Sequence, residues 1–465
     1  MSQMHNIIAI ATPAGAGAIA VIRISGPDAW ELAAAQFVSI HKKDLLKQKS
    51  HSIHLGHVTD GDMLLDQVLV SLFKGPNSYT GENVVEISCH GSSYIQQEIL
   101  QLFLRKGCQM AAGGEFTLRA FLNGKLDLSQ AEAVADLIAS DNAAAHQIAM
   151  QQMRGGFSSE IKALREELLN FASLIELELD FAEEDVAFAD RAAFKSLLEK
   201  ISRVLRQLID SFALGNVIKN GIPVAIVGAP NAGKSTLLNA LLNEERAIVS
   251  DIAGTTRDTI EDEISIGGIG FRFIDTAGIR DTQDQIEKLG IAKTFEKIEQ
   301  AQLVVYMIDL KKAQDDLAVI TADTAVLAKL KETYPTKPLL VLGNKADLIS
   351  PEAFTQIQTQ IPSLSALSAK EKEGIQSLKD AFLNAVNTGA LRNNDSIVTN
   401  SRHYDALIRA QEEIGKVQEG LAANLTSDLM AIDIRQALYH FGEITGEISS
   451  DELLGNIFAN FCIGK

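Results

Sequence analysis

The sequence predicts a multidomain chain of the α/β plus α class, and three observations support this. Short apolar runs separated by turns predict an amino-terminal α+β domain. Long alanine- and leucine-rich amphipathic stretches, which stop and later resume, predict a helical bundle domain. An apolar run that leads through a glycine-rich loop into a helix predicts a mostly parallel, doubly wound α/β domain. The expected boundaries are 1–118, 119–216, 217–385 and 386–465.

The first domain is predicted from strand-like runs between turn signals. The turns are Ser-Gly-Pro at 25–27 and Gly-Pro-Asn-Ser at 75–78, and they separate runs of the length and composition of strands. These runs are Ile7–Ala11, Ile19–Ile24, Val68–Phe73 and Val84–Ile87.

The helical domain is predicted in two parts. Glu160–Leu169 and Phe194–Leu208 are amphipathic at helical spacing, and helical patterning resumes at about 401–461, after the polar linker 392–396. Because the termini of a domain often lie close together and tolerate insertions, the simplest arrangement places the α/β domain inside one helical domain.

Residues 228–235 read GAPNAGKS, which is a phosphate-binding loop. In such a loop the backbone N–H groups face the phosphates, Lys234 neutralises the β and γ oxygens, and the hydroxyl of Ser235 ligates Mg²⁺. The context agrees, because the buried-strand run 222–227 precedes the loop and an amphipathic helix at 235–242 follows it.

Further motifs indicate the base and the reaction. Asn344 and Asp347 follow the apolar run 338–342, so they lie where open α/β sheets bind ligands, and a carboxylate there accepts hydrogen bonds from guanine. The sequence Asp-Thr-Ala-Gly at 275–278 supplies an aspartate that holds Mg²⁺ through water and an amide for the γ-phosphate. Ile279 follows it where many GTPases have a water-orienting glutamine, so another residue must orient the water.

The composition limits the possible functions. The chain has 465 residues, 46% of them hydrophobic, which suffices for about three domains. A net charge of −18 argues against indiscriminate binding to nucleic acid, although a local basic groove stays possible. The scattered Cys89, Cys108 and Cys462 favour a reducing cytoplasm. No stretch approaches a membrane span, and the amino terminus does not read as a signal peptide.

Three patterns are open to a second interpretation. Residues 15–20 fit the dinucleotide fingerprint GxGxxA, but the segment that follows resembles a strand instead of the required helix. His51, His54 and His57 recur every third residue, which on a strand scatters them over both faces, so surface positions are favoured over a metal site. The acidic run 183–185 is interpreted as a solvated helix end.

Beyond these motifs, the chain resembles the MnmE (TrmE) family of bacterial tRNA-modification GTPases, within the TrmE-Era-EngA-like superfamily. The resemblance covers essentially the full length and ends on Asn-Phe-Cys-Ile-Gly-Lys at 460–465. It departs from the family pattern at Ala16, where a basic residue is common, and at Gly113, which replaces a proline. The other matching segments are 11–13, 23–26, 75–82, 114–116 and 120–128.

The resemblance implies a reaction and partners. Family members act with an FAD-dependent protein, MnmG, as a heterotetramer, and they place an aminomethyl or carboxymethylaminomethyl group on C5 of the wobble uridine of certain tRNAs. The amino-terminal domain is expected to resemble tetrahydrofolate-binding folds, to form a homodimer and to bind a formyl-folate as one-carbon donor. Its expected folate contacts are Arg23, Glu86, Lys125 and Lys465.

The resemblance also implies a potassium-activated GTP hydrolase in which K⁺ replaces an arginine finger. Catalysis is assigned to Lys234 and to Glu287, which matches the water-orienting glutamate of the family, and Mg²⁺ to Ser235 and Thr256. The potassium ligands are Asn231, Ser250, Ile252 and Thr255. The full set expected to contact GTP is Asn231, Ala232, Gly233, Lys234, Ser235, Thr236, Ser250, Asp251, Ile252, Ala253, Gly254, Thr255, Thr256, Asp275, Thr276, Ala277, Gly278, Asn344, Lys345, Ala346, Asp347, Ser368, Ala369 and Lys370.

Two other functions are compatible with parts of the sequence. A GTPase switch in ribosome or RNA assembly would lack modification chemistry of its own, but such proteins usually append basic RNA-binding domains, and this chain is acidic. A folate-dependent enzyme with a vestigial GTPase is disfavoured by Lys234, Asp275 and Asp347. Cys462 is either a nucleophile or a buried small residue, and its apolar neighbours favour the second.

Overall fold

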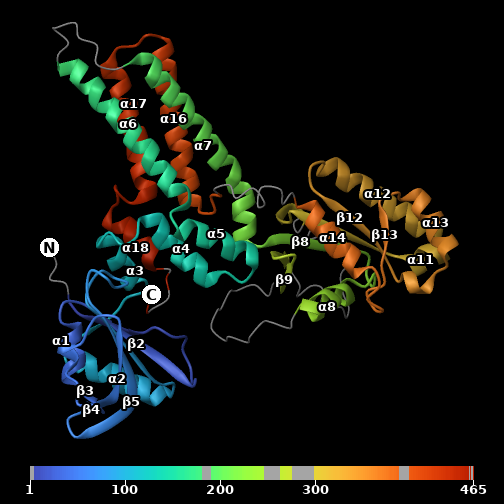
Figure 1. Ribbon diagram of the computed structural model, residues 1–465. Coiled ribbons are helices and arrows are strands. Elements are labelled where there is room, and N and C mark those ends of the chain that lie inside the picture. Colours follow the sequence, from blue (N-terminus) through green and yellow to red (C-terminus); the bar gives the residue numbers. More distant parts are fainter. Residues whose placement is uncertain are drawn as a thin grey trace. The chain divides into compact units, whose positions relative to one another are not determined.

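The computed structural model describes residues 5–180, 190–245, 262–274, 298–386, 397–459, 461 and 464 (Figure 1). The chain divides into two compact units. The first comprises Met1–Ala139, Ala149–Ile209 and Ser401–Lys465, and the second comprises Ser140–Ile148 and Asp210–Asn400. Residues 140–148, which the sequence assigns to the helical domain, pack within the second unit. The four boundaries expected from the sequence stay predictions.

The amino-terminal part of the first unit is built on a seven-stranded sheet in the order β3-β4-β5-β6-β2-β1-β7. The four runs interpreted as strands are confirmed as β1, β2, β5 and β6, whereas β3, β4 and β7 were not predicted. The strand reading of the segment after Gly15 is likewise confirmed by β2. The bounds are β1 (Ile7–Ile10), β2 (Ile19–Ser25), β3 (Phe37–Ser39), β4 (Ser52–Asp60), β5 (Met63–Phe73), β6 (Val84–His90) and β7 (Gln109–Met110).

Helices cover one face of this sheet. Helix α2 (Ser93–Arg105) buries Ile99, Leu102 and Phe103 against the strands, and α1 (Ala29–Ala35) buries Trp30. The strands alternate buried and accessible residues, as expected for a sheet with one covered face.

The three histidines at 51, 54 and 57 do not share one environment. His51 precedes β4 and is exposed, His57 is half-buried, and His54 is buried, so the expectation of a surface position is wrong for His54. Its Nε2 lies 2.8 Å from Ser52 Oγ. Burial lowers the pKa of His54, and the charge of Lys43 adds to this effect. His54 lies opposite Val70 of β5, which belongs to the core of this sheet, and the local pattern did not predict the strand that places it there.

The remainder of the first unit is helical. Figure 1 shows α6, α7, α16 and α17 side by side as a bundle, and the long helices expected from the sequence are confirmed. The helices that lie wholly in this unit are α3 (Glu115–Leu122), α4 (Leu128–Ala139), α6 (Gly156–Asp180), α16 (Ser401–Ala422), α17 (Ser427–Thr445) and α18 (Asp451–Ala459). Helices α5 (Ala143–Met153) and α7 (Arg191–Asn220) are shared, because residues 143–148 and 210–220 belong to the second unit. The acidic run 183–185 lies outside the described residues.

A buried ionic cluster joins the two sequence-distant parts of this helical region. Glu132 on α4 accepts hydrogen bonds from Arg402 Nε and Nη2 at 2.9 Å, and its Oε2 lies 2.6 Å from His403 Nε2. Burial raises the pKa of Glu132, but the charges and hydrogen bonds of His403 and Arg402 outweigh it and bring the pKa from 4.5 to about 2. This carboxylate therefore contributes its full stabilisation above pH 4.5, the pKa it has in the unfolded chain. The contribution is lost as the pH falls from 4.5 to about 2.

We expect Glu132→Gln to lower the free energy of unfolding by about 3 kcal/mol, because it removes the buried carboxylate that pairs with the guanidinium of Arg402. Denaturant unfolding monitored by circular dichroism measures this change. The matched control is Glu167→Gln, which removes an exposed pair with Lys200 at 2.7 Å and should cost less than about 1 kcal/mol. Equal effects of the two substitutions would contradict the assigned role of the buried cluster.

The second unit contains a six-stranded sheet in the order β13-β12-β11-β8-β10-β9. All neighbours are parallel except β9 and β10, and β11 is buried along its whole length. This confirms the mostly parallel α/β fold. The strands are β8 (Ile222–Gly228), β9 (Asp262–Ile266), β10 (Ile269–Phe273), β11 (Leu303–Asp309), β12 (Leu339–Asn344) and β13 (Leu364–Ala366).

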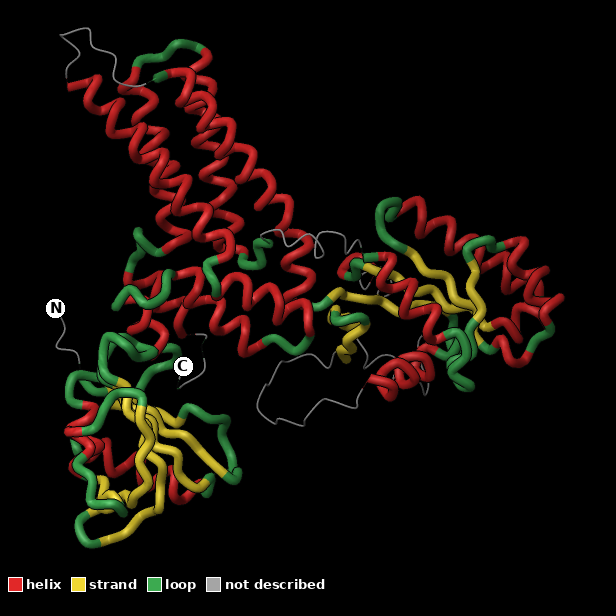
Figure 2. The backbone as a smooth tube through the Cα atoms, viewed as in Figure 1, coloured by secondary structure: helices red, strands yellow, loops and turns green. Residues whose placement is uncertain are grey.

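Helices pack on both faces of this sheet, as Figure 2 shows. One core includes residues of α8 and α14, in which Phe382 stacks on Phe271 with ring centroids 5.2 Å apart. The opposite core includes α12 and α13. Because the parallel strands all end at one edge, the loops after β8 and β12 meet there. The helices are α8 (Lys234–Glu245), α11 (Leu310–Asp315), α12 (Leu317–Thr333), α13 (Pro351–Gln360) and α14 (Ile375–Ala385), with the short 3₁₀ helix η4 (Ala346–Leu348).

Two of the three thiols lie in described parts of the chain. Cys89 and Cys108 are buried and unpaired, and burial raises the pKa of each thiol to about 11. Cys462 lies outside the described residues, so its role stays a prediction. No helix in the described part of the chain is long and apolar enough to cross a membrane.

Candidate functional site

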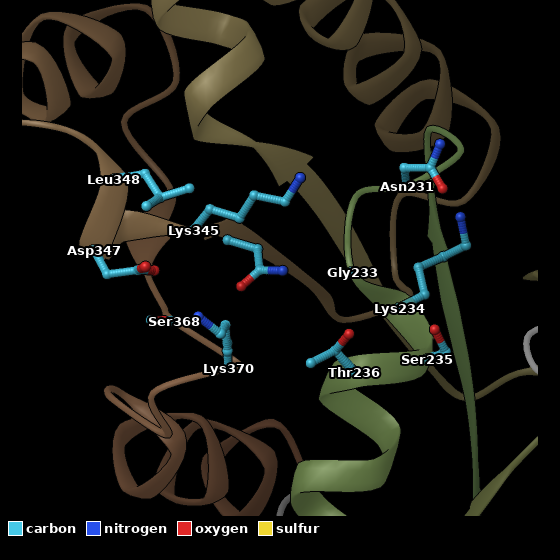
Figure 3. Close-up of a pocket in the computed structure, with 11 residues that line it drawn as sticks. Asn231, Gly233, Lys234, Ser235, Thr236, Lys345, Asp347, Leu348, Ser368 and Lys370 are labelled. Atoms are coloured by element: carbon cyan, nitrogen blue, oxygen red, sulfur yellow. The ribbon is translucent and has the colours of Figure 1, made fainter.

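A pocket of about 530 Å³ opens at the carboxyl edge of the parallel strands of the second unit. Figure 3 shows the phosphate-loop residues on one side of it and the residues after β12 on the other. The phosphate loop at 228–235, the segment 344–347 and the predicted GTP contacts at 368–370 therefore meet at one cavity. Its lining residues are Asn231, Gly233, Lys234, Ser235, Thr236, Asn344, Lys345, Asp347, Leu348, Ser368 and Lys370.

The loop between β8 and α8 has a backbone that only particular residues adopt. Gly228 and Gly233 have φ values of 148° and 97°, a region that residues with a Cβ rarely adopt. A Cβ on Gly228 would also collide with the carbonyl oxygen of Met307, and a Cβ on Gly233 would collide with Asn344 Nδ2. Asn231 takes φ of 63°, which asparagine tolerates better than most residues. The glycines thus let the loop approach β11 and β12 closely.

Lys234 begins α8 and holds the shape of the loop. Its Nζ donates hydrogen bonds to the carbonyl oxygens of Gly228 and Ala229, each at 2.9 Å. Ser235 and Thr236 follow in the first turn of the helix, whose leading N–H groups have no intrahelical acceptor. A helix N-terminus with an ammonium group beside it is a suitable site for an anion such as phosphate.

Asn344 connects the two sides of the pocket. Its side chain is buried, its Nδ2 donates to the carbonyl oxygen of Ala232 at 2.8 Å, and its Oδ1 accepts from Ala369 N at 3.0 Å. Both ends of the amide therefore bond to neighbouring loops. The sequence placed Asn344 among the base contacts, and the structure assigns it a bracing contact between the phosphate loop and the loop at 365–370.

The residues predicted to contact the base come from two loops. Asp347 lies in η4 and directs its carboxylate into the pocket (Figure 3). Ala346 N donates to the carbonyl oxygen of Leu367 at 3.0 Å, which ties this loop to the next. Ser368 is fully buried, and its hydroxyl accepts from Glu371 N at 3.3 Å, whereas Lys370 is exposed at the rim.

Sequence reasoning missed two residues of this region. Leu348 lines the pocket next to Asp347. Asp309 is not among the lining residues and pairs with Lys345, with Nζ and Oδ2 2.5 Å apart. Asp309 ends the apolar run Leu303–Asp309, and its register partner in the parallel sheet is Asn344. A carboxylate at the end of a buried strand was therefore the signal that could have indicated it.

Several residues predicted for this site lie outside the described residues, so their assignments stay predictions. They include Glu287, the predicted water-orienting residue. The others are Ser250, Asp251, Ile252, Ala253, Gly254, Thr255, Thr256, Asp275, Thr276, Ala277 and Gly278.

The residues predicted for folate lie in the first unit. Arg23 on β2 is the register partner of Glu86 on β6, and Arg23 Nε donates to Glu86 Oε1 at 2.8 Å. The guanidinium also lies over the rings of Tyr79 and Phe116, and its Nη1 donates to the carbonyl oxygen of Gly464 at 3.2 Å.

The two lysines predicted for the same site are placed differently. Lys125 Nζ donates to the carbonyl oxygen of Pro76 at 2.9 Å. Lys465 lies outside the described residues. The structure therefore brings Arg23 and Glu86 into direct contact and joins them to the carboxyl-terminal segment through Gly464.

Comparison with known proteins gives the family. The model of the TrmE amino-terminal domain, described as "GTP-binding protein TrmE N-terminus", matches residues 6–125, and that of the MnmE helical domain matches residues 128–462. The chain belongs to the MnmE family. The second match spans the α/β unit that lies between the two helical parts of the chain.

Relatives in this family are similar over their whole lengths. The tRNA modification GTPase MnmE of Flavobacterium psychrophilum is 69% identical over 465 residues, covering 100% of both chains. MnmE of Cytophaga hutchinsonii is 53% identical and covers 100% of this chain and 98% of the relative. Among solved structures, the FeoB G-domain from Methanococcus jannaschii aligns with 36% of this chain and 97% of that chain at 26% identity, with a TM-score of 0.25.

Proposed function

We propose that this chain is a potassium-activated GTPase that acts with the flavoprotein MnmG on tRNA. In the proposed reaction, an aminomethyl or carboxymethylaminomethyl group is added to C5 of the wobble uridine, with a tetrahydrofolate derivative as one-carbon donor. Membership in the MnmE family establishes the coarser part, a GTP hydrolase of tRNA modification. The potassium ion, the folate, the homodimer, the flavoprotein partner and a cytoplasmic location belong to the proposal.

The observation that carries the GTPase assignment is the bond pattern of Asn344. Because its amide joins Ala232 of the phosphate loop to Ala369 of the loop at 365–370, the anion site and the carboxylate of Asp347 open into the same pocket. A nucleoside triphosphate needs both sites at once. A carboxylate accepts from the ring N–H and amino group of guanine, which adenine does not offer, so the preferred base is guanine.

The chemistry assigned to the pocket is phosphoryl transfer to water. The amides of the phosphate loop and the Lys234 ammonium stabilise negative charge on the β and γ phosphates, and Glu287 would orient the water. The hydroxyl of Ser235 and the amide oxygen of Asn231 both belong to pocket-lining residues, and such hard oxygen donors fit Mg²⁺ and K⁺. Thr256 would complete the magnesium ligands, and Ser250, Ile252 and Thr255 the potassium ligands. These cations would supply positive charge next to the phosphates.

The folate assignment is supported by the chemistry of the paired residues. A pterin ring offers N–H donors, and the partly exposed carboxylate of Glu86 can accept from them. Arg23 orients that carboxylate, because its guanidinium is itself held by two aromatic rings and by Gly464. Lys125 and Lys465 would meet the negative tail of the folate. A folate derivative supplies the one-carbon unit when it is bound.

Deletion of the gene followed by mass spectrometry of tRNA nucleosides tests this function. Loss of the C5-modified wobble uridine, restored by the wild-type gene, is the expected result. Unchanged modification together with GTP turnover by the purified protein would instead favour a GTPase switch in RNA assembly.

Replacing potassium by sodium at equal ionic strength should reduce GTP turnover at least about tenfold, because the smaller ion does not fill the same oxygen cage beside the phosphates. Steady-state phosphate release measures this effect. The turnover rate in potassium should also rise with protein concentration if two nucleotide domains pair. Rubidium, which is close to potassium in size, is the matched control and should preserve most of the rate. Equal rates in sodium and potassium would remove the potassium ion from the mechanism.

A further inference from the structure

Asp309 is a buried carboxylate that lies outside the nucleotide pocket. It ends β11, and only 4% of its surface is exposed. Its Oδ1 accepts from the backbone N–H groups of Lys311 and Lys312 at 3.1 and 3.3 Å, which caps the N-terminus of α11. Its Oδ2 lies 2.5 Å from Lys345 Nζ. The two oxygens therefore have different partners, one backbone and one cationic.

The backbone of Lys345 has an unfavourable conformation, which the ion pair with Asp309 can stabilise. It has φ of 64°, in the left-handed region that costs a residue with a Cβ on the order of 1 kcal/mol or more. This conformation turns the chain between Asn344, which braces the phosphate loop, and Asp347, which faces the pocket. The direction of the Asp347 carboxylate depends on how firmly Lys345 is held.

We propose that Asp309 is a positioning residue for guanine recognition. It anchors the ammonium of Lys345 from outside the set of pocket-lining residues and thereby holds the loop 344–347 in the conformation that binds the base. Because Asp309 is not a pocket-lining residue, its effect passes through Lys345. This inference rests on the proposed GTPase function and adds a residue that sets how tightly the guanine nucleotide is held.

The chemistry of the carboxylate separates this role from helix capping. A cap needs one acceptor oxygen, whereas the ion pair needs a second oxygen with negative charge. In Asp309→Asn, the amide can keep the cap only by placing its NH₂ group against the Lys345 ammonium. If the amide turns over, the NH₂ group meets the N–H groups of α11 instead. In Asp309→Ser, the hydroxyl can still cap the helix but provides no charge for Lys345.

The experiment measures nucleotide release and steady-state turnover with the full-length protein. Asp309→Asn should accelerate release of a fluorescent GDP analogue and raise KM for GTP, each by roughly tenfold, the factor expected from losing one hydrogen bond between charged groups. The value of kcat at saturating GTP should stay within about twofold, because the phosphate groups are bound by other residues. Asp309→Ser should behave in the same way, which keeps the test open if the asparagine variant does not fold.

The matched control is Asp316→Asn. Asp316 caps the next helix, α12, by accepting from Ala318 N at 2.9 Å, and it does not line the pocket. Its release rate and KM should equal those of the wild type. A purely structural role of helix caps would instead make the Asp309 and Asp316 variants alike, which would overturn the proposal.

A double-mutant cycle with Lys345→Met tests whether Asp309 acts through Lys345. If it does, Asp309→Asn should have less than about a threefold further effect on release in the Lys345→Met background. If the wild type binds GTP, multiplicative effects of the two substitutions would overturn the positioning role. An unchanged KM in the asparagine and serine variants would overturn it as well. Failure of the wild type to bind GTP would overturn the proposed function itself.

Discussion

Lys234→Ala is expected to reduce kcat for GTP hydrolysis by at least about a hundredfold. The reason is that the ammonium both neutralises the transferred phosphoryl group and organises the loop that surrounds it. In the structure Nζ donates to the carbonyl oxygens of Gly228 and Ala229 at 2.9 Å, so the substitution also removes two bonds that hold the loop. We therefore expect weaker GTP binding as well as slower turnover. Single-turnover phosphate release at saturating GTP separates the two effects.

The control for this variant is Lys416→Ala. Lys416 is an exposed residue of α16 that pairs with Glu413 at 2.8 Å, and its removal should leave GTP turnover unchanged. Thermal unfolding of both variants checks that the fold is kept. A Lys234→Ala enzyme with kcat within threefold of the wild type would contradict the assignment of the phosphate site.

Asp347→Asn is expected to change the preferred base from guanine to xanthine. The carboxylate accepts two hydrogen bonds from guanine, whereas an amide presents one acceptor and one donor. Xanthine carries a carbonyl oxygen in place of the guanine amino group. The NH₂ group of the asparagine can donate to this oxygen, while the asparagine oxygen accepts from the ring N–H. We expect the ratio of kcat/KM for GTP over XTP to fall by at least about a hundredfold. Competition of both triphosphates for hydrolysis measures this ratio.

Asp380→Asn is the matched control for that substitution. Asp380 lies on α14 of the same unit, where its carboxylate accepts from Gln376 at 3.1 Å on the protein surface. It should leave the base preference as in the wild type. If Asp347→Asn kept the preference for GTP over XTP, the base would not be recognised by the group we assign.

The GTPase motifs could be located from the sequence because each is contiguous and local. A buried strand, a glycine-rich turn and a helix N-terminus follow one another in 222–242, and the structure has β8, the loop and α8 there. The same holds for Asn344 and Asp347, which follow the strand β12 directly. Because parallel strands end at one edge of the sheet, both loops are expected to line one cavity, and the observed pocket agrees with this expectation.

Contacts between segments far apart in the chain were predicted less well. The strand β4, which carries the buried His54, was missed because its pairing with β3 and β5 stabilises it. Residues 140–148 have a helical composition that matches the bundle, yet Ala144 N donates to the carbonyl oxygen of Gly268 at 2.9 Å within the second unit. Helical periodicity identifies an apolar face but does not identify the partner that covers it.

The family and the mostly parallel α/β fold of the second unit could be predicted from the sequence alone, because motif spacing and the pattern of apolar runs along the chain define them. The domain boundaries and the roles of the site residues stay predictions. Only the tertiary structure decided that Asn344 braces two loops, that Asp309 holds Lys345, and that Arg23 is bound between two rings and Gly464. The physical reason is that hydrogen bonds and ion pairs depend on distances of a few ångströms between side chains from different segments. Residue spacing within one segment does not specify those distances.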